Sequence, residues 1–141
     1  MKKTFITLIV CIAALAACNT ENNMTTENAE AVEVTQPDSL LRHVVAFSFK
    51  ETSSPAAIDS VITAFEALPS QIETIKGFER GTNNSPEGLD KGFTHIFTLT
   101  FHDEAGRATY LPHPAHKAFG ALLGPHLKDV LVLDYWTQPA K

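Results

Sequence analysis

Cysteine and positively charged residues are both scarce in this sequence. Each scarcity limits the classes of protein to which the chain can belong. The 141 residues include two cysteines, Cys11 and Cys18, and eleven Lys and Arg against sixteen Asp and Glu, for a formal net charge of −5. A nucleic-acid-binding domain normally carries a basic patch, so this balance argues against a nucleic-acid partner. The sequence also lacks a Gly-rich nucleotide motif and a Walker motif. Hydrophobic residues make up 44% of the chain, which is typical of a globular protein.

A hydrophobic run long enough to cross a membrane is also missing. The apolar stretch after Lys2 and Lys3 covers residues 5–17, whereas a spanning helix needs roughly 20 apolar residues. This pattern predicts a signal peptide over residues 1–17. The stretch ends Leu-Ala-Ala-Cys18, which resembles the lipobox of bacterial lipoproteins. The resemblance implies a lipid on Cys18, membrane attachment through that lipid, and a domain in the periplasm or at the surface of a bacterial cell envelope. The alternative is an ordinary signal peptide cut near Ala17.

The segment that follows is acidic and contains no Lys or Arg. Residues 18–39 hold five acidic residues, are rich in Asn and Thr, and lack aromatics. Such a composition buries too little apolar surface to offset the entropy of ordering, so we expect a flexible tether. Because Cys11 falls in the signal peptide, the mature chain would keep one cysteine and no intrachain disulfide.

Residues 40–139 show the hydrophobic periodicities of a folded domain. Alternating and short apolar runs predict strands, and apolar residues at helical spacing predict helices. Ser54-Pro55 is an N-cap signal, and Pro69 ends the helix that it begins. We expect strands over 41–49, 78–82, 94–102 and 130–136, and helices over 55–68, 103–111 and 116–123. This order predicts an α+β, ferredoxin-like βαββαβ fold, with a four-stranded antiparallel sheet and its helices on one face.

The other face of the predicted sheet is small and semi-apolar. On the first and third strands it consists of Val44, Ala46, Ser48, Ile96, Thr98 and Thr100. A face of this kind is too apolar for water and too small to form a core by itself. It therefore predicts a homodimer in which two sheets pack face to face.

Four segments of the domain resemble the stress-responsive A/B barrel family, often called Dabb. They are Arg-His-Val-Val-Ala-Phe-Ser-Phe-Lys50, Gly-Phe-Thr-His-Ile-Phe-Thr-Leu-Thr-Phe101, Tyr-Leu-Pro-His-Pro-Ala-His116 and Val-Leu-Asp-Tyr135. The resemblance covers 40–136 and implies a ferredoxin-like subunit paired into a dimeric α+β barrel. Its best understood members are plant polyketide cyclases, which perform a cofactor-free aldol closure. The resemblance places His43, Tyr110 and His116 at their catalytic positions, and it places Phe65 where the cyclases have a further Tyr.

The residues themselves indicate a similar site. His43 and His95 share strand parity with the large apolar side chains, so both point toward the helices. His116 opens a helix, where the positive end of the dipole disfavours a charged imidazole, and a neutral His can accept a proton. Tyr110 could donate a hydrogen bond to a carbonyl or a developing enolate. We therefore expect an apolar or aromatic ligand against His43, Phe65, His95, Tyr110 and His116, with proton abstraction next to a carbonyl as the possible reaction.

Each of these residues also has a purely structural interpretation. His43 could be a core histidine bonded to backbone, His95 could brace the fold, and Tyr110 could fill the seam between helix and sheet. For His113 we favour the role of helix cap. His113 and His116 have no carboxylate at the spacing of a metal site, and no cysteine is available as a ligand. We therefore expect no dedicated metal site and no cofactor. The alternative that the sequence leaves is a loosely held, hydrated Mg²⁺.

Three classes of function fit the sequence: a stress-associated dimer, a binder of a small apolar ligand, and a cofactor-free cyclase or lyase. Activated polyketide substrates are normally cytoplasmic, whereas the lipobox indicates the envelope. We therefore place the stress-associated or binding function first and the enzyme second.

Overall fold

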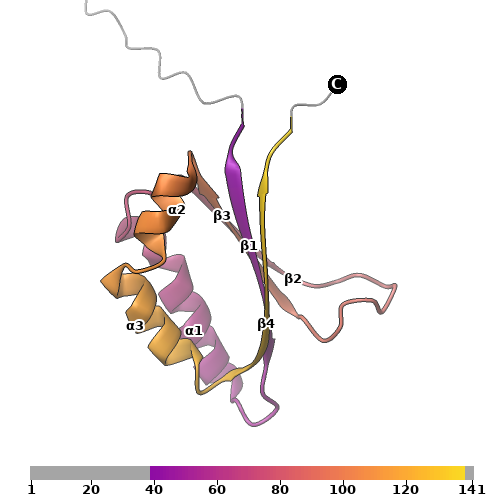
Figure 1. Ribbon diagram of the computed structural model, residues 1–141. Coiled ribbons are helices and arrows are strands. Elements are labelled where there is room, and N and C mark those ends of the chain that lie inside the picture. The colour runs from indigo at the N-terminus through magenta and orange to yellow at the C-terminus, as the bar shows by residue number, and fades with distance from the viewer. Residues whose placement is uncertain (1–38, 139–141) are drawn as a thin grey trace, which may run out of the picture. The chain divides into compact units, whose positions relative to one another are not determined.

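The computed structural model describes residues 39–138. The predicted signal peptide, Cys18 and all of the tether except Ser39 lie outside the described residues. The elements follow the order β1 (Leu41–Phe49), α1 (Pro55–Glu66), a 3₁₀ turn (Leu68–Ser70), β2 (Gly77–Thr82), β3 (His95–Phe101), α2 (Glu104–Tyr110), α3 (Pro114–Leu123) and β4 (Leu127–Trp136). The strands form one antiparallel sheet in the order β2-β3-β1-β4. The helices lie on one side of it (Figure 1). This is the predicted ferredoxin-like fold.

Local sequence explains where the helices begin. The Ser54 hydroxyl accepts a hydrogen bond from the Ala57 amide at 3.3 Å, and Asp103 caps α2 in the same way through Gly106 at 2.7 Å. A side chain that accepts from the first turn satisfies one of the unpaired amides of a helix. The expected His113 cap is confirmed, because its Nδ1 accepts from the Ala115 amide at 3.2 Å. Helix α3 begins at Pro114, directly after this cap, as the cap position predicts; periodicity alone had placed its start at 116.

The last strand also begins earlier than predicted, at Leu127 rather than Val130. Its first residue pairs with Phe49 across a register shift that follows Ser48. The alternation of inward and outward side chains is interrupted at such a shift. The periodicity of the sequence therefore placed the first residue of β4 too late. As a result β4 pairs with the whole length of β1.

The core lies between the helices and the inner faces of β1 and β3. Phe47, Phe65, Phe97 and Phe119 form an aromatic cluster at its centre, and the ring centroids of Phe65 and Phe119 are 4.4 Å apart. All four rings are buried. The predicted orientation of the large strand residues toward the helices is therefore confirmed.

Strand β4 is far less covered than β1 and β3. Val130 and Val132 pair with Phe47 and Val45 and so share their inner face, yet they are 42% and 47% exposed. On the outer face, Leu131, Leu133 and Tyr135 extend the semi-apolar surface that the sequence located on β1 and β3. Within residues 39–138, no helix has both the length and the hydropathy that a membrane crossing requires.

Candidate functional site

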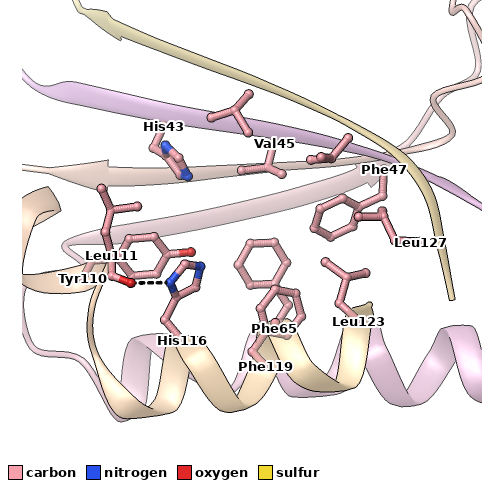
Figure 2. Close-up of a pocket in the computed structure, with 13 residues that line it drawn as sticks. His43, Val45, Phe47, Phe65, Tyr110, Leu111, His116, Phe119, Leu123 and Leu127 are labelled. Atoms are coloured by element: carbon pink, nitrogen blue, oxygen red, sulfur yellow. Dashed lines mark hydrogen bonds between the residues drawn. The ribbon is translucent and has the colours of Figure 1, made fainter. Parts of the chain in front are cut away.

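A cavity of about 250 Å³ lies between strands β1 and β4 and the three helices. Most of its wall is apolar, and its polar side chains are His43, Tyr110 and His116. Figure 2 shows these three side chains together at one end of the cavity, with Phe65, Phe119, Leu123 and Leu127 toward the other end. The cavity thus has a polar end and an apolar end.

His43 projects from β1 into the polar end and is 6% exposed. Its Nδ1 lies 3.0 Å from Oδ1 of Asp134, its partner across the β1–β4 pairing. Because an ionised carboxylate only accepts hydrogen bonds, we assign the ring proton to Nδ1. This tautomer leaves Nε2 as a hydrogen-bond acceptor.

Asp134 is a site residue that the sequence analysis missed, although it belongs to one of the quoted motifs. Its Oδ1 accepts from His43 and also from Nη1 of Arg107, at 2.9 Å, in the last turn of α2. Burial alone would raise the pKa of Asp134, but hydrogen bonds and charge from Arg107 and His43 lower it below its ordinary value. The sequence signal that would have found Asp134 is strand alternation. Asp134 lies two residues after Val132 and four after Val130, so its side chain points to the same inner face of β4.

His116 stands in the first turn of α3 and bonds backward to the preceding loop. Its Nδ1 lies 2.9 Å from the Leu111 carbonyl oxygen. A carbonyl oxygen can only accept, so Nδ1 carries the proton and Nε2 of the neutral ring is again an acceptor. The dashed line in Figure 2 marks this bond.

Tyr110, the last residue of α2, lies between the two histidines. Its ring centroid is 5.7 Å from that of His43 and 4.2 Å from that of His116. The side chain is 1% exposed, and burial raises the pKa of its hydroxyl well above the usual range. Tyr110 therefore stays protonated and can donate a hydrogen bond.

Two further residues from the sequence analysis have different outcomes. Phe65 lines the cavity as expected, with its ring stacked on Phe119. His95 does not line it: it lies at the start of β3, edge-on to Phe49 at 5.0 Å, where burial and Arg80 lower its pKa. We therefore leave His95 out of the candidate site. Among residues 39–138 no three His, Cys, Asp or Glu side chains gather in a way that could hold a metal ion.

Comparison with known families assigns residues 41–137 to the Stress responsive A/B Barrel Domain. The chain belongs to this family. The Dabb chain is 40% identical over 95 residues to the stress-response A/B barrel domain-containing protein HS1 of Arabidopsis thaliana, covering 67% of this chain and 87% of that protein. It is 25% identical to the olivetolic acid cyclase of Cannabis sativa, again over 95 residues, covering 67% of this chain and 94% of the cyclase.

Solved structures of similar fold include an enzyme and a protein of unknown function. The hydroxynitrile lyase of Passiflora edulis superposes on the Dabb chain with a TM-score of 0.69 at 27% identity, covering 74% of this chain and 99% of the lyase. A dimeric ferredoxin-like protein of unknown function from Thermobifida fusca gives a TM-score of 0.60 at 27% identity, covering 72% and 94%. Relatives with this fold thus include enzymes and a protein of unknown function.

Proposed function

We propose that this Dabb protein binds a small ligand that has a carbonyl group and an apolar or aromatic body. The observation that carries the proposal is the convergence of one donor, Tyr110, and two acceptors, His43 and His116, at one end of an apolar cavity. A carbonyl oxygen would accept from Tyr110, and a ligand hydroxyl or acidic C–H would face an imidazole nitrogen. The apolar end would hold the rest of the molecule. A pocket with few polar groups and a large apolar wall is typical of small-molecule sites.

A second function, proton abstraction next to a carbonyl, is favoured by the Asp134–His43 pair. A carboxylate on Nδ1 fixes the ring orientation and stabilises the imidazolium that forms when Nε2 accepts a proton. The proton would pass from carbon to Nε2 of His43, the electron pair would form an enolate, and Tyr110 would donate to the enolate oxygen. Carbon–carbon closure or cleavage could follow. The likeness to a cyclase and a lyase supports this candidate, whereas Phe65 supplies no hydroxyl.

The binding proposal is tested with benzoylacetone, a small aromatic 1,3-dicarbonyl compound whose keto and enol forms differ in ultraviolet absorption. Tyr110→Phe removes one hydroxyl and nothing else, so we expect about tenfold weaker binding with little loss of stability. His43→Ala and His116→Ala should also weaken binding. His102→Ala, which changes a histidine outside the cavity, is the matched control. Failure of the unaltered protein to bind, or equal binding by all variants, would contradict the proposal.

We also propose that the protein is anchored in a bacterial envelope through a lipid on Cys18, with the domain in water. The support is the sequence pattern alone: basic start, short apolar run and boxed cysteine. Two or more acyl chains give stable anchoring where one chain is marginal. Cys18→Ala should leave either an uncleaved precursor or a soluble protein, as fractionation with a labelled fatty acid would show. Normal labelling of this variant would overturn the anchor.

The third part of the proposal is a homodimer formed by the outer faces of two sheets. The outer face carries Val44, Ile96, Leu131, Leu133 and Tyr135, and several of these side chains are about half exposed. A large contiguous apolar surface normally marks an interaction site. The dimeric state of the protein from Thermobifida fusca supports a homodimer.

A further inference from the structure

Arg107 contacts the site without lining the cavity, and neither function above assigns it a role. It belongs to α2, three residues before Tyr110, so both side chains leave the helix on the same side. Tyr110 packs edge-on to the His43 ring, while Arg107 reaches Asp134. One short helix therefore supplies both the ring that packs on His43 and the guanidinium that binds the carboxylate partner of His43.

The arrangement of the Arg107, Asp134 and His43 atoms is specific. Arg107 Nη1 and His43 Nδ1 both bond to the same carboxylate oxygen, at 2.9 and 3.0 Å. The Arg107 side chain is 25% exposed, that of Asp134 is 32% exposed and that of His43 is 7% exposed. Water reaches part of the guanidinium and of the carboxylate, but the His43 ring that lies against them is buried. The two charges therefore act on the imidazole at hydrogen-bond range, where screening by salt is weakest.

The two charges have opposite effects on His43. A carboxylate alone at 3.0 Å would favour the protonated imidazole, which cannot accept a proton. A guanidinium on the same oxygen offsets that carboxylate and repels a second positive charge. The titratable and charged groups that face His43 within the described residues are Asp134 from β4, Arg107 and Tyr110 from α2, and His116 from α3; β3 contributes the apolar Leu99 and Phe101.

We propose that Arg107 is a positioning residue that offsets the charge of Asp134 and thereby keeps His43 neutral, with Nε2 free to accept a proton from the ligand. The inference deepens the proposed function and rests on it for the identity of the ligand. It assigns the site a preference for uncharged ligands with an acidic hydrogen, because the Arg107–Asp134–His43 group has no net charge before proton transfer. After transfer the group carries one positive charge, which stabilises an enolate beside it.

The test is a histidine NMR titration of the full chain in mild detergent, comparing three variants with the unaltered protein. Arg107→Gln keeps a hydrogen-bond donor and removes the charge, so the pH midpoint of the His43 signal should rise. Arg107→Lys, which restores the charge, should return the midpoint toward its original position. A purely structural role would be satisfied by Gln and would leave the midpoint in place.

The matched control is Arg80→Gln. Arg80 pairs with Glu66 on the other side of the domain and lowers the pKa of His95. Loss of Arg80 should raise the pH midpoint of the His95 signal and leave the His43 midpoint unchanged. A raised His95 midpoint also shows that the method detects the removal of one charge. An unchanged His43 midpoint in Arg107→Gln, alongside a moved His95 signal in Arg80→Gln, would overturn the inference.

Benzoylacetone binding, measured over the same pH range, separates this inference from the proposed function. If the proposed function and the role of Arg107 both hold, binding should weaken as the pH is lowered. In Arg107→Gln this weakening should begin at a higher pH than in the unaltered protein. A moved His43 midpoint in a protein that does not bind benzoylacetone supports the role of Arg107 and contradicts the proposed ligand class. Binding by the unaltered protein with no moved midpoint supports the ligand class and contradicts the role of Arg107.

Discussion

The two cavity histidines have their Nδ1 atoms occupied in different ways, and this difference sets what each can do. His43 faces a carboxylate that can compensate a positive charge, whereas His116 faces the Leu111 carbonyl, which carries only a dipole. An imidazolium is better stabilised by an ionised partner than by a neutral one. Of the two, His43 is therefore the better candidate for the base and His116 for a ligand-orienting acceptor.

Asp134→Asn tests the carboxylate at the scale of one residue. At pH 7 the variant should be destabilised by up to about 1 kcal/mol, because the charge-assisted hydrogen bonds from Arg107 and His43 are lost and water already screens part of this carboxylate. Since the folded state lowers the pKa of Asp134 below 3.8, this stabilisation is present above that value and disappears as the pH falls below it. Denaturant unfolding from pH 7 down to pH 2 checks the sign. A difference between the two proteins that stays constant over this range would contradict the prediction.

At the scale of elements, the site depends on where two short helices begin and end. Helix α2 ends with Tyr110, and α3 begins four residues later, so the Leu-Pro-His turn sets the 4.2 Å separation of the Tyr110 and His116 rings. The cap and the site residue share one turn of α3, since His113 caps the helix and His116 follows in its first turn. Local chain geometry thus positions one half of the polar end.

His113→Ala and Ser54→Ala form a matched pair of cap variants. Each removes one side-chain acceptor from a helix N-terminus, so each should destabilise the fold by about 1 kcal/mol. Only the first lies beside His116, so only His113→Ala should also weaken benzoylacetone binding. Thermal melts and titrations of both variants measure the two effects. Equal loss of binding in the pair would show that binding follows stability and not the position of His116.

At the scale of the whole molecule, the helices cover only part of the sheet. They pack on β1 and β3, while inner-face residues of β4 such as Val132 are about half exposed. Within residues 39–138, no helix lies on the outer face of the sheet (Figure 1). Apolar area of this kind is stabilised by removal from water. The proposed dimer would bury the outer face.

Ala46→Glu tests the dimer, because it would place two like charges in a desolvated contact at the centre of the outer face. Ala46 is already 7% exposed and is flanked by Ile96 and Leu131 in the sheet. We expect residues 40–141 to sediment as a dimer and the Ala46→Glu variant to sediment as a monomer. Leu89→Glu, at a loop position that is 67% exposed, should leave the dimer intact. A monomeric unaltered domain would contradict the proposed assembly.

The sequence by itself determined the fold class, the element order and the inward direction of His43. Strand alternation and helix caps act over a few residues, so they can be identified along the chain. The same local information located the His113 cap, whereas the resemblance to the Dabb family placed Phe65, Tyr110 and His116 at the site. Parity alone was insufficient for His95, because it gives the face of a sheet and not the distance along it.

Only the tertiary structure decided which side chains of the site contact one another. Asp134 lies 91 residues from His43, and only the β1–β4 register brings the two side chains together. Arg107 joins them from α2 through its ion pair with Asp134. A register shift at Ser48 set the start of β4, which periodicity could not locate. Hydrogen bonds between distant elements depend on pairing and packing over the whole domain, and these are not contained in any short stretch of sequence.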